Sequence, residues 1–348
     1  MEGKIAVRRA AASLLACWCL AAGPACREII DYDDGSPPGS RVSIVWERTN
    51  GLAGEAILAL RVDQTGILYA GTESGKIFRS VTDGNDWSPV LLPTADGAIT
   101  AIITDPLRRI FVANDIHGVF ESIDAGVSWS PINGGLEDTA IYALAYLPSG
   151  ALVAGSARGD VSVTGSGVPI WTRKFSFART VTSLLVLSSE EIYAAAWSAG
   201  IYRFGELGAA AEAVNAGLQD LYVNALHSGA SGYLFAGTRT GGVFRSDLGD
   251  IFWQNTGGGS ISREVIAFRT SQYNELFAGT GTGIFISADA GLHWTKLDAG
   301  IGSQEVRALA INGNATVFAG TIDGVYRSIR LDPGGTLARV PQAAFLPR

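Results

Sequence analysis

Tryptophan recurs along this chain at a nearly constant interval, and no other feature limits the possible fold as strongly. Six of the eight tryptophans form the series, Trp46, Trp87, Trp129, Trp171, Trp253 and Trp294, with Glu212 at the one place where it is interrupted. Serine keeps the same period at Ser80, Ser122, Ser162, Ser246, Ser287 and Ser328. Residues 42–328 therefore divide into seven units of about 41 residues, which predicts a fold of seven structural repeats.

Each unit contains four short segments that read as β-strands. In the last unit these are residues 306–309, 317–321 and 325–328, with a turn at Asp323-Gly324, and the preceding unit shows the fourth segment at 294–297. Four short strands repeated every ~40–45 residues are typical of the blades of a β-propeller. We therefore expect an all-β, seven-bladed β-propeller with about 41 residues per blade.

The two ends of the repeat region predict how the ring closes. The last unit supplies three strands, whereas residues 42–48 form one strand that belongs to no unit of its own. Because Trp46 keeps the tryptophan register, this strand is expected to complete the last blade beside residues 325–328.

A small Ala-Gly pair recurs in the second strand of five units. The pairs are Ala70-Gly71, Ala154-Gly155, Ala236-Gly237, Ala278-Gly279 and Ala319-Gly320. A larger side chain would hold two neighbouring blades apart, so the pairs predict a close approach between blades.

Residues 1–25 have the organisation of a signal peptide. Lys4, Arg8 and Arg9 precede an uncharged stretch at 10–22, which is too short to span a bilayer and is followed by small residues. We expect export, to the periplasm, to the outer membrane as an anchored lipoprotein, or to the medium. We expect residues 26–41 to form a tether, residues 42–328 to form the propeller, and residues 329–348 to form a flexible C-terminal tail.

All cysteines of the chain, Cys17, Cys19 and Cys26, lie in or just after this leader, so we expect no disulfide or thiolate metal site in the propeller. Cys26 occupies the place of the acylated cysteine of a bacterial lipoprotein. It is therefore either a lipid anchor, which would be the only link to a membrane, or a free thiol left by cleavage after Ala25. The net charge of −7 argues against nucleic acid as a partner.

Two turns share a motif that points to a family. Residues 122–129 and 287–294 both follow the pattern Ser-x-Asp-x-Gly-x-x-Trp, with Ser122, Asp124, Gly126, Trp129, Ser287, Asp289, Gly291 and Trp294 at its fixed places. The pattern resembles the Asp box, also called the bacterial neuraminidase repeat. Residues 80–87, 162–171 and 246–253 are degenerate copies. The resemblance implies a structural role for the boxes, at the periphery and away from the ligand-binding face.

The family that this motif resembles includes sialidases, other glycosidases, sortilin-like receptors and photosystem II assembly factor-like propellers. Sialidases carry an Arg-Ile-Pro motif, which does not occur in this chain. His117, His227 and His293 fall at different places in their units, so no metal-ligand spacing arises. We therefore expect no catalytic residues, no metal and no cofactor.

The loops between the second and third strands are the expected ligand-binding face. Most begin with Thr or Ser, and Trp197 is expected to take that place in its unit. Arg158 and Arg239 lie in the neighbouring units and Arg179 in the adjacent connection, which suggests a basic patch around an aromatic anchor. The alternative is a tryptophan that packs inward among solvated arginines.

The other half of this face is more acidic, with Glu73, Asp115, His117 and Asp323. An uneven charge distribution favours an oriented protein partner over a neutral polysaccharide. The sequence thus predicts an exported, non-enzymatic platform for another envelope or secreted protein. The alternative is a carbohydrate-active propeller, a lectin or glycosidase acting on extracellular glycans, with Trp197 stacking on a sugar.

Overall fold

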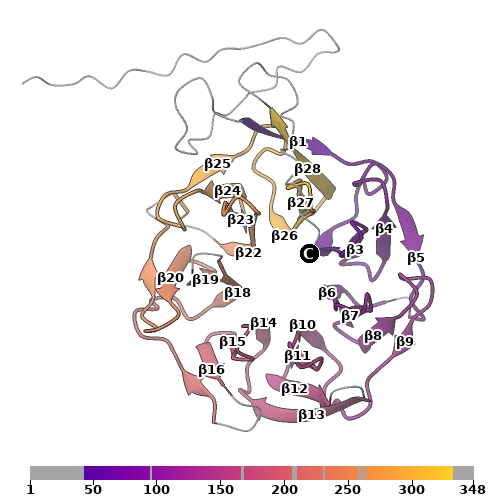
Figure 1. The fold of residues 1–348 in the computed structure, drawn as a ribbon, viewed down its shortest axis with the longest axis vertical. Coiled ribbons are helices and arrows are strands. Elements are labelled where there is room, and N and C mark those ends of the chain that lie inside the picture. Colours follow the sequence, from indigo (N-terminus) through magenta and orange to yellow (C-terminus); the bar gives the residue numbers. More distant parts are fainter. Residues whose placement is uncertain are drawn as a thin grey trace, which may run out of the picture.

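The computed structural model describes residues 43–94, 96–165, 168–205, 210–229, 232–257, 260–261 and 264–331. Their secondary structure consists of β-strands arranged in seven four-stranded antiparallel sheets. The sheets stand around a central opening like the blades of a fan (Figure 1). The chain is thus an all-β, seven-bladed β-propeller, as the repeat predicts.

We number the blades in chain order, from blade 1 (β2 to β5) to blade 7 (β26 to β28 with β1). The innermost strands are β2 (Ile57–Val62), β6 (Ile99–Thr104), β10 (Ile141–Tyr146), β14 (Val181–Val186), β18 (Val223–Ser228), β22 (Val265–Thr270) and β26 (Val306–Ile311). The second strands are β3 (Leu68–Thr72), β7 (Ile110–Asn114), β11 (Leu152–Ser156), β15 (Ile192–Ala196), β19 (Tyr233–Thr238), β23 (Leu276–Thr280) and β27 (Val317–Thr321).

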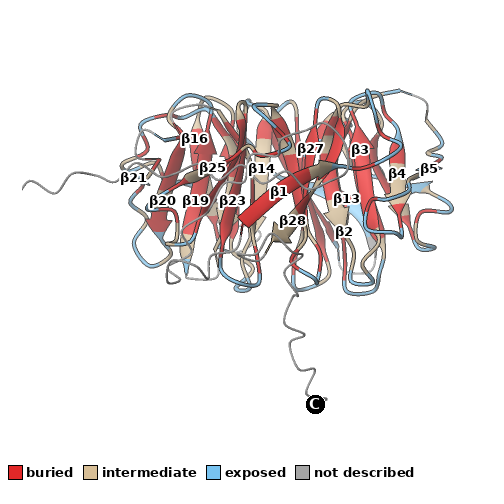
Figure 2. Cartoon of the chain, turned by 90° about the horizontal axis from the view of Figure 1, so that it is seen from above, coloured by how far each residue is buried: buried red, intermediate tan, exposed pale blue. Residues whose placement is uncertain are grey.

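The third strands are β4 (Ile77–Ser80), β8 (Gly118–Ser122), β12 (Asp160–Gly165), β16 (Gly200–Phe204), β20 (Val243–Asp247), β24 (Gly283–Ser287) and β28 (Gly324–Leu331). The outermost strands are β5 (Ser88–Val90), β9 (Ser130–Pro131), β13 (Val168–Ser176), β17 (Glu212–Ala213), β21 (Gln254–Asn255), β25 (Thr295–Leu297) and β1 (Ser43–Arg48). Burial follows this order, since the second strands are almost entirely buried and exposed residues concentrate in the loops of the two faces (Figure 2).

The glycines of the second strands lie where neighbouring blades touch. A Cβ atom added to Gly71 would stand 2.3 Å from Ile99 Cγ2 of the next blade, and one added to Gly155 would stand 2.4 Å from Val181 Cγ1. The close approach predicted from the Ala-Gly pairs is therefore confirmed, because these positions have no room for a side chain.

The N-terminal strand closes the ring as expected. β1 pairs antiparallel with β28, and Trp46 stands opposite Ser328. The backbone N–H of Trp46 also donates to Ala299 O in blade 6, at 2.8 Å. Ile44 and Trp46 are buried, with 1% and 3% of their surface exposed, so β1 is a core strand of blade 7 (Figure 2).

Several expectations fall outside the described residues: the signal peptide 1–25, the tether 26–41 with Cys26, and the tail from residue 332 onward. β28 continues to Leu331, three residues past the last predicted repeat. No helix long and apolar enough to cross a membrane occurs in the part of the chain that the structure describes.

Candidate ligand-binding face

The two faces of the ring carry different loops. One face, here the junction face, holds the connections from blade to blade and the loops between second and third strands. The opposite face holds the loops between first and second strands and the third-to-fourth hairpins, which include Asp124 and Asp289. Trp197, Arg158, Arg179 and Arg239 all belong to the junction face.

The two Ser-x-Asp-x-Gly turns are held by the same set of hydrogen bonds. Ser122 Oγ donates to Asp124 Oδ1 at 2.8 Å and accepts from the Gly126 N–H at 2.8 Å, while the Ser128 N–H donates to Asp124 Oδ1. Ser287, Asp289 and Gly291 repeat this arrangement. Hydrogen bonds from the Ser128 side chain and backbone lower the pKa of Asp124 to about 2. The two carboxylates therefore stabilise the turns in which they lie, through hydrogen bonds within each turn.

An aromatic–arginine cluster stands on the junction face between blades 4 and 5. The rings of Trp197 and Tyr222 meet edge to face, with centroids 5.2 Å apart. The guanidinium carbon of Arg239 lies 5.6 Å from the centroid of the Trp197 ring, in cation–π contact. Trp197 is half-buried, whereas Tyr222 is 42% exposed and Arg239 is exposed.

Backbone hydrogen bonds connect this cluster to the neighbouring loops. The Trp197 N–H donates to Thr180 O at 2.8 Å, and Thr180 Oγ1 donates to Ala157 O at 3.0 Å. Gly159 packs directly against the backbone of Arg179. Arg158, Arg179, Trp197, Tyr222 and Arg239 therefore follow one another across adjoining loops, and we call this set the arginine–tryptophan arc.

The register of blade 4 corrects one expectation about Trp197. Ala196 pairs with Val181 in blade 4, just as Thr72 pairs with Ile57 in blade 1. Ala196 therefore occupies the first loop position, which is Thr or Ser in most other blades. The loop is one residue longer than the sequence reading assumed, which puts Trp197 at the next position. At that position the Trp197 N–H donates to Thr180 O, in the connection that leads into blade 4. The Arg239 N–H makes the equivalent bond in blade 5, to Tyr222 O.

Tyr222 is the member of the arc that sequence reasoning missed. Its carbonyl accepts the Arg239 N–H at 2.9 Å, and the equivalent acceptors in blades 1 to 3 are Ala56, Ala98 and Ala140. Blades 4 and 6 have Thr180 and Glu264 there. An aromatic residue at a place that the other blades fill with alanine or a polar residue is the same kind of departure that singled out Trp197. Comparing the blade junctions as well as the loops would have found it.

The guanidinium groups of the three arginines have no carboxylate partner within 4 Å among the described residues, although the backbone N–H of Arg158 donates to Asp138 Oδ2 at 2.9 Å. Arg158, Arg179 and Arg239 are all exposed, and the guanidinium of Arg179 donates only to the neighbouring Ala178 O, at 3.2 Å. Their charges are therefore available to an external ligand.

The acidic half of the face is engaged within the protein instead. Glu73 pairs with Arg307 at 3.0 Å, His117 with Asp96 at 2.6 Å, and Asp323 with Arg48 at 2.6 Å. Asp115 accepts the Ala98 N–H at 2.6 Å. The two halves thus differ in the charge that is available to a ligand. The arginines of the basic half have no ion-pair partner among the described residues, whereas the acidic residues are bound within the protein.

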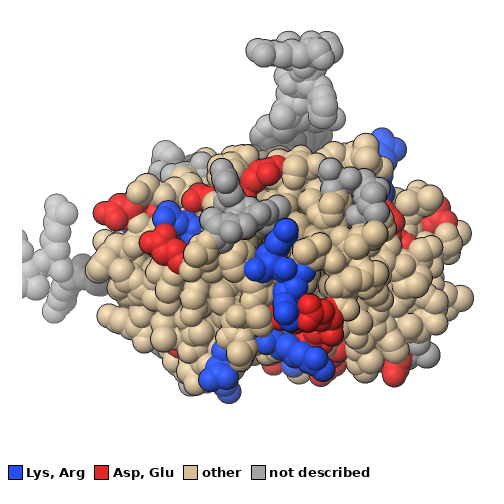
Figure 3. All heavy atoms as spheres, turned by 90° about the horizontal axis from the view of Figure 1, so that it is seen from below, with Lys and Arg blue, Asp and Glu red and all other residues tan. Residues whose placement is uncertain are grey.

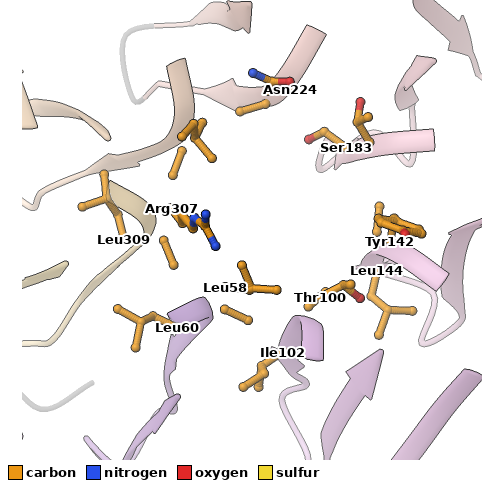
Figure 4. Close-up of a pocket in the computed structure, with 18 of the residues that line it drawn as sticks. Leu58, Leu60, Thr100, Ile102, Tyr142, Leu144, Ser183, Asn224, Arg307 and Leu309 are labelled. Carbon is orange, nitrogen blue, oxygen red and sulfur yellow. The ribbon is translucent and has the colours of Figure 1, made fainter. Parts of the chain in front are cut away.

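A narrow channel of about 240 Å³ runs along the axis of the ring. Each innermost strand has a bulge after its first residue, and the extra residue of every blade lines the channel: Leu58, Thr100, Tyr142, Thr182, Asn224, Ile266 and Arg307 (Figure 4). Thr100 Oγ1 and Thr182 Oγ1 donate to backbone carbonyls of the next blade at 2.6 Å. These two threonines therefore link neighbouring blades by hydrogen bonds at the junction-face end of the channel.

The rim near β13 carries a band of basic side chains with acidic ones beside it (Figure 3). Arg173 pairs with Glu137 at 2.5 Å and Arg203 with Glu212 at 2.8 Å, so part of this charge is compensated. Among the residues described, no three His, Cys, Asp or Glu side chains are grouped so as to hold a metal ion.

The fold is shared with many solved structures. The protein YCF48 bound to a D1 peptide superposes with a TM-score of 0.68 at 14% identity, over 86% of this chain and 97% of that one. Virginiamycin B lyase from Staphylococcus aureus gives 0.69 at 11% identity, over 82% and 99%. At these identities the likeness establishes the fold alone.

The extracellular domain of BT4673 from B. thetaiotaomicron gives a TM-score of 0.68 at 14% identity, over 82% of this chain. This chain spans 40% of the length of that domain. No family model and no curated protein matches the sequence.

Proposed function

We propose that this chain is an exported, non-enzymatic propeller that binds a protein partner through the arginine–tryptophan arc. The observation that carries the proposal is the open cluster of Trp197, Tyr222 and Arg239, which continues into the unpaired Arg158 and Arg179. Trp, Tyr and Arg are the residues most enriched at the energetic centres of protein interfaces. Unpaired guanidinium groups favour a partner that presents carboxylates.

The comparisons support a protein ligand without identifying it. A propeller of the same fold has been solved with a peptide bound, and others are extracellular domains. The Asp-box turns support membership of the bacterial neuraminidase repeat family. In that family the boxes lie away from the ligand-binding face, so their position on the opposite face supports the junction face as the proposed binding side.

The alternative of a carbohydrate-active propeller depends on a sugar ring stacking on Trp197. The guanidinium of Arg239 already lies over that ring, and Tyr222 packs against it edge to face. A lectin or glycosidase would have to use what remains of the indole surface. This geometry favours the protein partner.

The test is capture followed by quantitative binding. Residues 27–348 are crosslinked to a host envelope extract beside the variant Trp197→Ala/Arg158→Ala/Arg239→Ala, and a captured protein is purified and titrated. We expect the triple variant to lose at least roughly tenfold in affinity, since such hot-spot residues contribute 2 kcal/mol or more. The control Arg173→Ala/Lys174→Ala removes two charges from the exposed rim and is expected to bind like the parent.

The outcomes separate the alternatives. Capture of glycan alone would replace the protein-platform proposal with the carbohydrate one and justify a hydrolysis screen. A protein partner bound equally by the triple variant would show that the arc is not its site.

The proposed location in the envelope is tested separately. We propose that residues 1–25 are a signal peptide and that Cys26 is either acylated or a free thiol. Metabolic labelling with a fatty acid, in the parent and in Cys26→Ala, distinguishes these. Label in the parent that the variant loses establishes the anchor, and an unlabelled exported parent establishes plain cleavage.

A further inference from the structure

The opposite face carries a second group of basic residues, at the far end of the central channel. Arg61 in β2, His227 in β18 and Arg269 in β22 occupy the same position, the fifth residue of an innermost strand. Arg269 lines the channel. Blades 1 and 6, which supply the two arginines, flank blade 7.

All three side chains have neutral partners. Arg61 Nε donates to Thr104 Oγ1 at 3.1 Å, and Arg269 Nη1 donates to Phe268 O at 2.9 Å. His227 Nε2 shares a hydrogen bond of 2.7 Å with Thr270 Oγ1. Neither arginine has a carboxylate within 4 Å in the part of the chain that the structure describes.

The carboxylates of the neighbouring loops are committed elsewhere. Asp63 accepts from the backbone N–H groups of Thr65 and Ile67, at 2.8 and 2.9 Å. Asp105 is bound by the backbone and side chain of Arg109, at 2.8 and 2.7 Å. These hydrogen bonds hold both carboxylates in their own loops, and neither forms an ion pair with Arg61 or Arg269. Burial lowers the pKa of Arg61, and the more distant charge of Asp63 opposes that shift.

The electrostatics agree with this geometry. Burial and, to a smaller extent, the positive charge of Arg61 together lower the pKa of Arg269 to about 10. Burial, followed by the charge of Arg269, lowers the pKa of His227 to about 3. At neutral pH both arginines are charged and His227 is neutral, so two cations repel each other at one end of the channel. The charge of Asp63 offsets part of the charge of Arg61, whereas no carboxylate acts in this way on Arg269 among the described residues.

We propose that this end of the channel binds a small oxyanion, a carboxylate or a phosphate, between Arg61 and Arg269. A buried charge is stable when it is paired, and guanidinium groups pair best with planar or tetrahedral oxyanions. The channel volume of about 240 Å³ leaves room for a small ion or for one such group of a larger molecule. The site lies on the face away from the arginine–tryptophan arc and does not depend on the function proposed for the arc.

The test is calorimetric titration of residues 27–348 with inorganic phosphate and, separately, with succinate, at constant ionic strength set by sodium chloride. We expect at least one of the two anions to bind. Arg269→Gln should weaken that binding by roughly tenfold or more, because a hydrogen bond to a charged group is worth 1.5–3 kcal/mol. Arg61→Gln should act in the same direction.

Arg173→Gln on the exposed rim is the matched control and should bind like the parent. Circular dichroism checks that each variant is folded, and Arg61→Gln keeps the test available should Arg269→Gln fail to fold. Absence of binding by both anions, or equal binding by parent and both channel variants, would overturn the proposal. Which anion binds identifies the oxyanion chemistry of the site.

Discussion

Single atoms decide how closely two blades can approach. At Gly71 the nearest atom to an added methyl group would be Ile99 Cγ2, at 2.3 Å, and at Gly320 it would be Ile57 Cγ2, at 2.6 Å. Both neighbours are the first residue of the next innermost strand, and both are buried. The glycine of the Ala-Gly pair is therefore required by packing against the next blade.

Gly71→Ala is expected to lower the free energy of unfolding by about 1–3 kcal/mol, because overpacking displaces Ile99 or the strand behind it. Gly134→Ala is the matched control, since an added methyl group there meets nothing within 4 Å. Urea denaturation of both variants checks the prediction. Equal stability of Gly71→Ala and Gly134→Ala would show that the blades can separate without cost.

His227 makes stability depend on pH through its burial. An unfolded histidine has a pKa of about 6.5, and in the folded protein it is about 3. Below pH 6.5 the unfolded chain therefore binds a proton that the folded chain does not, so stability falls as pH falls toward 3. His227→Gln removes this contribution.

We expect the stability of the parent relative to His227→Gln to fall by up to about 1.4 kcal/mol for each pH unit below 6.5. The measurement is urea denaturation of both proteins between pH 7 and pH 4. Parallel pH profiles would contradict the buried neutral state of His227.

At the scale of elements, the indole N–H groups of three of the repeating tryptophans find their hydrogen-bond acceptors either in their own turn or in the preceding blade. Trp294 Nε1 donates to Gly291 O of its own turn, at 3.0 Å. Trp171 Nε1 and Trp253 Nε1 instead donate to Ile132 O and Val214 O in the preceding blade, at 2.5 and 2.7 Å. The complete turn of blade 6 thus holds its tryptophan locally, whereas these two degenerate hairpins are held through the preceding blade. The indole N–H of Trp129, in the other complete turn, has no hydrogen-bond partner among the described residues.

Asp289→Ala is expected to lower the free energy of unfolding by about 1 kcal/mol, because the turn loses the hydrogen bonds that this carboxylate makes with Ser287 and His293. Hydrogen exchange should accelerate first at the amides of β24 and β25. Asp250→Ala, an exposed position in the degenerate hairpin of blade 5, should leave exchange unchanged. Unchanged exchange in Asp289→Ala as well would remove the structural role assigned to the turn.

These elements also show what sequence could and could not predict. Strands, blade number and ring closure follow from a period that every unit repeats, because each must fill the same place in the ring. The environment of Trp197 does not follow from the period. Its loop, residues 196–200, has the same length as residues 114–118 of blade 2, but the indole stands one position later than expected and its partner Tyr222 lies in a different unit. The partners of Trp171 and Trp253 likewise come from the preceding blade, which no pattern within one unit reports.

For the whole molecule, stability depends on the non-covalent pairing of β1 with β28, here called the β1–β28 joint. β1 contributes two buried side chains, Ile44 and Trp46, and a row of hydrogen bonds to β28. Arg327 adds a contact to Glu47 at 3.3 Å. Without β1, blade 7 would have three strands, an unpaired edge on β28 and an exposed interface with blade 6.

A protein that begins at residue 50 is expected to melt at a lower temperature than one that begins at residue 42. Trp46→Ala should lower the free energy of unfolding by about 3–5 kcal/mol through the cavity it leaves. Circular dichroism during heating tests both. A truncated protein that melts like the longer one would show that β1 is not needed to hold the ring together.

The β1–β28 joint also fixes an order of events in folding. Blades 1 to 6 each come from one continuous stretch of chain, so each can form as soon as its own strands exist. Blade 7 joins residues such as Glu47 and Arg327, which are 280 positions apart, and contacts this distant in sequence form slowly. Ring closure is therefore the last step, and until it occurs a growing chain exposes the flanks of its first and last completed blades.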